Sequence, residues 1–453
     1  MEGGTVTKKT PKTPREVAAC TLFAVREEGA WSDGALHHYL SLAGLDARDA
    51  ALASQLAYGT IQNRTLCEHY LKKFSSVRLS KLFPRVRDCL ALGIYQLVLL
   101  DRIPAHAAVH ETVALVRGWA RAGEQAVRYA NGVLRAVARA VEDGTLPVLD
   151  CPTKEAYLAL RYSHPEWLTK RLCEEFGPDG AASICALDNE TAPLCLRVNL
   201  LKTSRDKVLA ELRGSGLSCA PHERIDNLIL CSGGDAAALP VFRRGEMTVQ
   251  DGASIVCVDV LGPRQGETVV DLCAAPGGKT CYIAEKMGNR GHVIAGDLYG
   301  HKLARIQDAA GRLGLSIIET RLADAAVFQP DLEGRADRVL CDVPCSGLGV
   351  IRKKPEIRWK SEQSLEGLPG IQLAILETGS RYVKPGGVLV YSTCTVLERE
   401  NLAVVQAFLQ NHAGFSLEGF SHSAVGEVSG GSITLLPHLH QTDGFFIAKL
   451  RRM

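Results

Sequence analysis

From about residue 250 onward, the chain alternates short β-branched runs with amphipathic stretches, and this alternation restricts the fold more than any other feature. The expected strands are TVVDLC, HVIAGDL, SIIETRL, DRVLCDV and GVLVYST. Stretches of helical periodicity lie between them, including KTCYIAEKM and GHKLARIQDAAGRLG. Alternating β and α segments build a parallel sheet covered by helices on both faces. Residues 249–453 are therefore expected to form an α/β domain whose ligands bind beyond the carboxyl ends of the strands.

The rest of the chain has a different pattern. Residues 12–145 carry apolar side chains at three- and four-residue spacing, as in RVRDCLALGIYQLVLL, which predicts an all-α bundle. Residues 146–164 fall in a stretch rich in Pro, Gly and Asp and are expected to be a linker. The sequence LCLRVNLLKTSRDKVLAELRGSGL then predicts a strand followed by a helix. This pattern indicates a small α+β subdomain over 165–248.

Composition limits the partners and the compartment. The 453 residues carry a net charge of only +2, so binding to nucleic acid would need a local basic face. The candidates are TKKTPKTPR at the start and IRKKPEIRWK, whose Trp359 also suits base stacking. The alternative is that these basic side chains only face solvent and that Trp359 only packs against the protein. With fifteen cysteines, no secretory signal and no long apolar run, we expect a cytoplasmic protein without a membrane span and with mostly free thiols.

A glycine-rich turn follows the first of these strands, in VVDLCAAPGGKT. Small residues there let the backbone approach a ligand, and the next helix start offers free N–H groups. A phosphate-binding P-loop would need glycine where Cys273 stands, and the G-x-G-x-x-G motif of dinucleotide sites is absent. S-adenosylmethionine fits better. Asp297 is then placed for the ribose hydroxyls and Asp324 for the adenine edge. A lone Asp at such a position is commonly a helix cap, but a series of them favours a nucleoside.

Two cysteines, Cys345 and Cys394, follow the fourth and fifth expected strands, so both belong to the ligand edge. Zinc would need four suitable ligands, and strand alternation turns Cys341 toward the core. A disulfide between them is disfavoured in a reducing compartment. A thiolate nucleophile with a second, assisting thiol remains. The spacing does not say which cysteine attacks.

A pyrimidine suits this pair, because its carbon 5 is too weak a nucleophile to take a methyl directly. Addition of a thiolate to carbon 6 makes carbon 5 nucleophilic, and loss of the carbon-5 proton with elimination of the thiol releases the product. An acid near ring nitrogen 3 would stabilise the developing charge, and Asp342 is the candidate. The substrate is then a cytosine or uracil in a flipped or single-stranded position.

Several blocks resemble the NOL1/NOP2/Sun family of RNA 5-methylcytosine methyltransferases. They are DLCAAPGGKT, CDVPCSGLGVIRKKPEIRW and VKPGGVLVYSTCTVLERENLAVV. The N-terminal part resembles NusB-like RNA-binding domains in AYGTIQNR and YANGVLRAVAR, and YSHPEWLTKRLCEEFG is similar to bacterial members that act on small-subunit ribosomal RNA. The resemblance implies a NusB-like helical domain, an RNA-binding α+β subdomain and a Rossmann-like S-adenosylmethionine-dependent methyltransferase domain.

The resemblance also implies roles for single residues. The nucleophile is Cys394, the helper in product release is Cys345, and Asp342 contacts both base and cofactor. The other implied cofactor contacts are Cys273, Ala274, Ala275, Pro276, Gly277, Gly278, Lys279, Asp297 and Asp324. Val343 stands where the family usually has alanine, which is expected to tighten the pocket. The pair His438 and His440 is expected to be a loop feature rather than a metal site.

The resulting expectation is a monomeric enzyme that needs no metal and methylates carbon 5 of one cytosine in small-subunit (16S) ribosomal RNA. Two alternatives stay open from the sequence. One is the same chemistry on a transfer RNA, because the site itself does not distinguish the two RNAs. The other is a NusB-like RNA-binding protein whose methyltransferase domain is inactive.

Overall fold

The computed structural model describes residues 10–232 and 234–453, so Lys8 and Lys9 of the basic N-terminal run lie outside the described residues. The chain divides into two compact units. The first contains the chain up to Glu190 together with Ile351–Lys360, and the second contains Thr191–Val350 and Ser361–Met453. Within the described residues, no helix is both long and apolar enough to cross a membrane.

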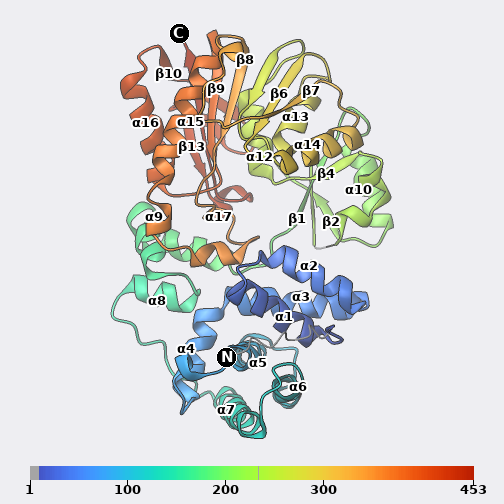
Figure 1. The fold of residues 1–453 in the computed structure, drawn as a ribbon, viewed down its shortest axis with the longest axis vertical. Coiled ribbons are helices and arrows are strands. Elements are labelled where there is room, and N and C mark those ends of the chain that lie inside the picture. The colour runs from blue at the N-terminus through green and yellow to red at the C-terminus, as the bar shows by residue number, and fades with distance from the viewer. Residues whose placement is uncertain (1–9, 233) are drawn as a thin grey trace, which may run out of the picture. The chain divides into compact units, whose positions relative to one another are not determined.

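The first unit is helical (Figure 1). Its helices are α1 (Pro14–Glu27), α2 (Ser32–Ala43), α3 (Ala47–Gln62), α4 (Arg64–Phe74), α5 (Pro84–Leu99), α6 (Ala105–Gly118), α7 (Glu124–Glu142), α8 (Lys154–Arg161) and α9 (Glu166–Leu187). Local signals set several ends: the Thr13 side chain accepts from the Glu16 N–H at the start of α1, and Asp46 caps α3 in the same way. Buried side chains of α5, such as Leu90 and Ile94, lie in the apolar core.

The segment Ile351–Lys360, from the middle of the sequence, is part of this helical unit. Arg358, in a short 3₁₀ turn (η4, Pro355–Trp359), is fully buried and donates to the carbonyl oxygens of Gln62 and Ser163 at 2.8 and 3.2 Å. The Arg64 guanidinium lies 5.4 Å from the centre of the half-buried Trp359 ring. The expectation that this run offers its cations to RNA is therefore wrong for Arg358, which is used inside the unit.

The second unit begins with a small antiparallel sheet in the order β2-β3-β1-β4. The strands are β1 (Leu194–Val198), β2 (Cys219–Pro221), β3 (Leu228–Cys231) and β4 (Met247–Val249), with α10 (Arg205–Gly214), a short 3₁₀ turn (η2, Ala236–Ala238) and α11 (Pro240–Arg243). Leu196, Val208 and Ile229 share its core. Cys219 and Cys231 face each other across β2 and β3 in a disulfide, so the expectation of free thiols fails for this pair. The other thirteen cysteines, all within the described residues, are free.

The larger sheet runs in the order β10-β14-β9-β8-β5-β6-β7, with β13 beside β14. Pairs among β5 to β9 are parallel, and β14 is antiparallel to β9. The strands are β5 (Thr268–Asp271), β6 (His292–Asp297), β7 (Ile318–Leu322), β8 (Ala336–Asp342), β9 (Val383–Thr393), β10 (Phe415–Leu417), β13 (Ser432–Leu435) and β14 (Phe445–Arg452), and a separate hairpin joins β11 (Phe420–His422) and β12 (Gly426–Val428). The predicted parallel α/β domain is confirmed.

Helices cover both faces of this sheet (Figure 1). One apolar core contains Val256, Ile283 and Leu313, and the other contains Leu376 and Phe408. The first three lie on α12 (Gly252–Leu261), α13 (Gly278–Lys286) and α14 (Gly300–Leu313), and the last two on α15 (Leu368–Tyr382) and α16 (Leu402–Asn411). A short helix, α17 (Pro437–His440), precedes β14. Because the central strands are parallel, their carboxyl ends meet at one edge.

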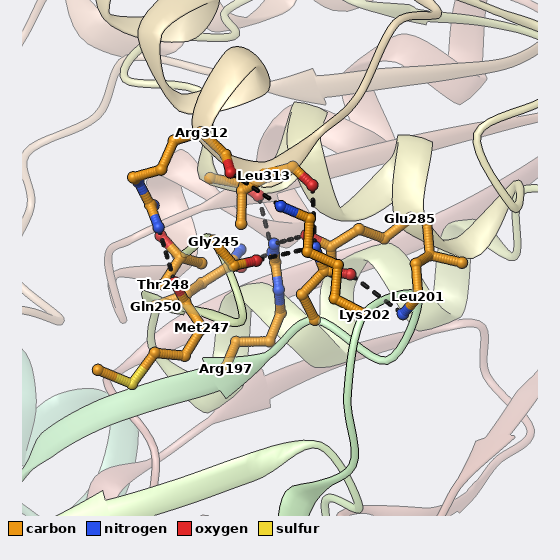
Figure 2. A network of polar contacts seen from close by, with 12 residues as sticks. Arg197, Leu201, Lys202, Gly245, Met247, Thr248, Gln250, Glu285, Arg312 and Leu313 are labelled. Carbon is orange, nitrogen blue, oxygen red and sulfur yellow. Dashed lines mark hydrogen bonds and ion pairs between the residues drawn. The ribbon is translucent and has the colours of Figure 1, made fainter. Parts of the chain in front are cut away.

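A buried polar network fastens the small sheet to this domain (Figure 2). Arg197 of β1 is fully buried and donates to Glu285 at 2.6 Å and to the Gly278 carbonyl at 3.0 Å. Arg312 of α14 donates to the Met247 carbonyl at 2.8 Å and to the Thr248 hydroxyl at 3.1 Å. Since Glu285 and Gly278 both belong to α13, β1 and the helix that follows the glycine-rich turn are held as one rigid assembly.

Candidate active site

The glycine-rich turn lies between β5 and α13, at the carboxyl edge of the sheet. Gly277 has φ +104°, and a Cβ there would lie 3.1 Å from the Ile306 backbone. An L side chain is disfavoured on both counts. The Ala274 N–H donates to the Gly296 carbonyl at 2.8 Å, which draws the turn against β6. The turn therefore has a defined path, with its backbone open to a close-lying ligand.

Asp271 is a residue of this region that the sequence expectations missed. It ends β5, is buried, and accepts a 2.7 Å hydrogen bond from the Thr280 hydroxyl through Oδ2. Burial raises the pKa of its carboxyl to about 7, against the lowering effect of Thr280. Its Oδ1 has no hydrogen-bond partner within residues 10–232 and 234–453. A buried carboxylate oxygen of this kind at a ligand edge is available to accept a hydrogen bond from a ligand.

Asp297 ends β6 and Asp324 follows β7, as the sequence predicts. Each makes the local contact of a turn: Asp297 accepts from the Tyr299 N–H at 3.0 Å, and Asp324 accepts from the Ala326 N–H at 2.9 Å. Asp324 also lines a small cavity of about 10 Å³, which is room for about one water, with apolar walls that include Leu272, Ile294, Ala325, Leu332 and Tyr382. A turn contact leaves an Asp at a strand end able to accept from a ligand as well, so the turn and ligand roles are compatible at these positions.

Lys279 and Asp342 form an ion pair on the same edge, 2.7 Å from Nζ to Oδ2. The Ser392 hydroxyl donates to the other Asp342 oxygen at 2.8 Å, which the sequence expectations did not include. Burial alone would lower the pKa of Lys279, but the charge and hydrogen bond of Asp342, together with the nearby Cys257 and Cys394 thiols, raise it. The ammonium also lies 4.9 Å from the centre of the Phe445 ring. The site therefore holds a fixed cation.

Cys345 and Cys394 meet at this edge, with their Sγ atoms 3.0 Å apart and both side chains partly exposed. The Cys394 N–H also donates to the Cys345 sulfur at 3.3 Å. The contact with Cys345 lowers the pKa of Cys394, and the Lys279 charge acts in the same direction. The contact with Cys394 and burial raise the pKa of Cys345. The positions of the two cysteines in the sequence do not distinguish them, but their surroundings in the structure do. These surroundings favour the thiolate on Cys394 and the neutral thiol on Cys345.

Other predicted residues lie away from this pair. Cys341 is fully buried in the core, as strand alternation predicts. Val343 is also buried in the core that contains Leu376, so its extra bulk relative to alanine is accommodated there rather than in the pocket. His440 lies in α17, where its Nδ1 contacts the Leu436 backbone. In the part of the chain that the structure describes, no group of three or more His, Cys, Asp or Glu side chains is arranged to hold a metal ion.

Known proteins were compared with this chain. It is 36% identical to the probable ribosomal RNA small subunit methyltransferase B of Bacillus subtilis (strain 168), over 97% of this chain and 98% of that protein. It is 34% identical to the ribosomal RNA small subunit methyltransferase B of Serratia proteamaculans (strain 568), over 97% and 98%. The chain belongs to the RsmB/F family of 16S rRNA methyltransferases. Residues 258–451 match the family of 16S rRNA methyltransferases RsmB/F.

The remaining matches agree with RsmB/F membership. Residues 12–139 match the NusB family, and residues 164–235 match the ferredoxin-like domain of RsmF/B-like methyltransferases. The crystal structure of PH0851 superposes with a TM-score of 0.80 at 28% identity, covering 98% of this chain and all of that one. The predicted NusB-like helical domain, small α+β subdomain and methyltransferase domain dependent on S-adenosylmethionine are confirmed.

Proposed function

We propose that this RsmB/F protein methylates carbon 5 of one cytosine in 16S ribosomal RNA, with Cys394 as nucleophile and Cys345 as the thiol that assists release. The observation that carries the proposal is the 3.0 Å separation of the two sulfur atoms on neighbouring strands, beside the Lys279–Asp342 pair. The names of the relatives from Bacillus subtilis and Serratia proteamaculans support the RNA class.

The residues at the sheet edge fit S-adenosylmethionine. Asp271 leaves one buried oxygen without a donor, Gly277 keeps the turn open, and Asp324 lines an apolar hollow. The residues proposed to hold it are Asp271, Cys273, Ala274, Ala275, Pro276, Gly277, Gly278, Lys279, Asp297, Asp324 and Asp342. When bound, S-adenosylmethionine supplies the electrophilic methyl group.

Cys394 starts the reaction. Its thiolate adds to carbon 6 of the cytosine, the carbon 5–carbon 6 double bond opens, and carbon 5 becomes nucleophilic. The lowered pKa of Cys394 favours the thiolate, and Lys279 stabilises that charge before the attack. Lys279 and Asp342 lie together at the cysteine edge, and we propose that they meet the polar edge of the base, where charge develops during the addition.

Cys345 acts in release. A base takes the carbon-5 proton, the carbon 5–carbon 6 double bond forms again, and the bond from carbon 6 to the Cys394 sulfur breaks, so Cys394 leaves as thiolate. We propose that Cys345 first gives its own proton to solvent water and then takes the carbon-5 proton as a thiolate, since a thiol with a raised pKa is the stronger base once deprotonated. The target base must leave its stack to reach the thiols. We propose that the enzyme acts as a monomer in the cytoplasm.

Covalent trapping tests the proposal. The Cys345→Ala variant is incubated with 16S rRNA and S-adenosylmethionine and then run on a denaturing gel. An RNA-linked protein band that disappears in Cys345→Ala/Cys394→Ser is expected. If no band forms while the wild-type protein still methylates that RNA, the assignment of Cys394 as nucleophile and Cys345 as the releasing thiol is wrong. If the wild-type protein methylates a transfer RNA instead, or no RNA at all, the corresponding alternative replaces the proposal.

A further inference from the structure

The loop that carries Cys345 is tied to a buried carboxylate outside the reacting groups. Glu400 ends a short 3₁₀ turn (η6, Glu398–Glu400) that follows β9, and its side chain is fully buried. Its Oε2 accepts from the Ser346 N–H at 2.8 Å, so the residue directly after Cys345 is hydrogen-bonded to Glu400. Hydrogen bonds to an ionised acceptor are among the stronger ones in proteins.

A second tie reaches the other side of Cys345. Gln372 of α15 is fully buried, and its Nε2 donates to the same Glu400 oxygen at 3.0 Å and to the Pro344 carbonyl at 3.1 Å. Pro344 and Ser346 flank Cys345. The Glu400 carboxylate therefore holds the backbone after the thiol, and the Gln372 amide holds the backbone before it. This arrangement restricts the Cys345 loop from both ends.

The same turn also holds the loop of Cys394. The Tyr391 hydroxyl donates to the Glu400 carbonyl. Asn401 contacts both neighbours of Cys394: its Oδ1 accepts from the Thr393 hydroxyl, and its Nδ2 donates to the Thr395 carbonyl at 3.1 Å. The loops of both cysteines are therefore hydrogen-bonded to the adjacent residues Glu400 and Asn401, which restricts the distance between the two thiols.

Packing alone does not account for a carboxylate at this position. Burying a charged group is unfavourable unless its oxygens are satisfied, and Glu400 Oε1 has no hydrogen-bond partner among residues 10–232 and 234–453. A neutral side chain would avoid that cost. The charge has an effect on the site, because it adds to the Cys394 contact and to burial in raising the pKa of Cys345.

We infer that Glu400 is a positioning residue for the release step: it sets the Cys345 thiol in place to take part in breakdown of the RNA adduct. The inference rests on the proposed function. Glu400 does not touch the base in this role and acts through Ser346 and Gln372. Its loss is expected to slow release more than adduct formation, since Asn401 still holds the neighbours of Cys394 and the Lys279 charge still acts on its thiol.

The test compares Glu400→Ala, Glu400→Gln and the exposed control Glu398→Gln, each as the full-length protein with 16S rRNA and S-adenosylmethionine. The amount of covalent adduct on a denaturing gel and the turnover of methylated RNA are measured together. Glu400→Ala is expected to accumulate adduct and to lose about tenfold in turnover, part of the roughly 10²- to 10⁴-fold that a positioned proton-transfer group supplies. Glu400→Gln keeps an acceptor oxygen for Ser346 but removes the charge, so it should recover only part of the turnover, and Glu398→Gln should match wild type.

The outcomes separate this inference from the proposed function. If Cys345→Ala itself accumulates no adduct, the proposed function fails. If Cys345→Ala accumulates adduct and Glu400→Ala does not, or if Glu400→Ala lowers adduct and turnover equally, only the positioning role is overturned. Should Glu400→Ala fail to fold, Gln372→Leu removes the Pro344 tie with the carboxylate intact, and it must then accumulate adduct for the inference to stand.

Discussion

The Cys345 and Cys394 sulfur atoms lie 3.0 Å apart although 49 residues separate them in the sequence. They meet because β8 and β9 are adjacent parallel strands in register, with Asp342 opposite Ser392, and each cysteine lies just beyond the end of its strand. The charges around the two thiols differ: Cys394 lies near both the Asp342 anion and the Lys279 cation, whereas Cys345 lies near the Glu400 anion. The pair is therefore held close and made chemically unequal by the same edge of the sheet.

Replacement of Lys279 by Met is expected to raise the pH at which methylation becomes fast. The attacking form is the thiolate, and the Lys279 charge helps to lower the pKa of Cys394. Without that charge the pKa of Cys394 rises and less thiolate is present at neutral pH, so the single-turnover rate there should fall by about tenfold if the pKa rises by about one. The pH–rate profile with saturating cofactor measures this. Lys286→Met, the same change on the same helix, should leave the midpoint unmoved; an unmoved midpoint in Lys279→Met would contradict the role.

Asp271→Asn is expected to stabilise the protein at alkaline pH while weakening cofactor binding. The folded pKa of Asp271 is raised to about 7 from an ordinary value near 4, so its contribution is most favourable below pH 4 and is lost as pH rises through 7. The neutral amide removes that loss, on the order of 1 kcal/mol or more at pH 8. Urea unfolding without cofactor at pH 5 and pH 8 measures the difference, and titration calorimetry measures S-adenosylmethionine affinity. An equal effect at both pH values would show that ionisation of Asp271 is not responsible.

Gly277→Ala should impair the glycine-rich turn. The residue has φ +104°, and a Cβ would lie 3.1 Å from the Ile306 backbone, so both strain and contact oppose the change. A non-glycine residue in a left-handed conformation costs about 1–2 kcal/mol. We expect a lower melting temperature and weaker S-adenosylmethionine binding by calorimetry. The matched control is Gly278→Ala, where the new Cβ meets only the Gln250 side chain at an ordinary 3.5 Å. Equal losses of stability in the two variants would rule out this explanation.

Arg358→Met should destabilise the helical unit. The change leaves the Gln62 and Ser163 carbonyls and the Asn189 side chain without a donor in a buried place. A buried acceptor left without its partner costs about 1–3 kcal/mol, so a loss of roughly 3 kcal/mol in unfolding free energy is expected. Chemical denaturation followed by far-ultraviolet circular dichroism measures it. Lys354→Met, in the same segment, should have a small effect. If Arg358→Met instead kept full stability and lost RNA affinity, the guanidinium would act on RNA after all.

The sequence predicts the catalytic sheet and the meeting of the two cysteines because both depend on local, periodic signals. Alternating strands and helices define a parallel sheet, and a parallel sheet brings the carboxyl ends of its strands together. Lys279 belongs to the predicted cofactor turn, and its contact with Asp342 follows from the same geometry. Which cysteine attacks does not follow from spacing and rests on family resemblance, because the difference lies in neighbouring charges contributed by other segments.

The misjudged residues depend on contacts between distant segments. The sequence IRKKPEIRWK is the same whether Arg358 contacts RNA or backbone carbonyls of its own chain, and the structure places Arg358 against the Gln62 and Ser163 carbonyls. In the sequence, Glu400 is one of several charged residues in a turn. Only the structure shows that Ser346 and Gln372 donate hydrogen bonds to it. Asp271 ends a strand like any other acidic residue, and only its burial and unpaired oxygen distinguish it. Burial of single polar side chains is not encoded by periodicity.

The chain passes from the helical unit to the second unit after Glu190, returns to the helical unit after Val350 and leaves it again after Lys360, so the two units are not joined by a single linker. A domain attached through one linker can be removed or exchanged by a single cut in the gene. Here the decapeptide Ile351–Lys360 is encoded inside the methyltransferase sequence, shortly after Cys345, yet packs as part of the helical unit. Deleting residues up to 190 would leave Arg358 without the oxygens of Gln62, Ser163 and Asn189 that it donates to. Recombination that exchanged the helical unit would therefore have to exchange these ten residues as well, so the two parts are inherited together.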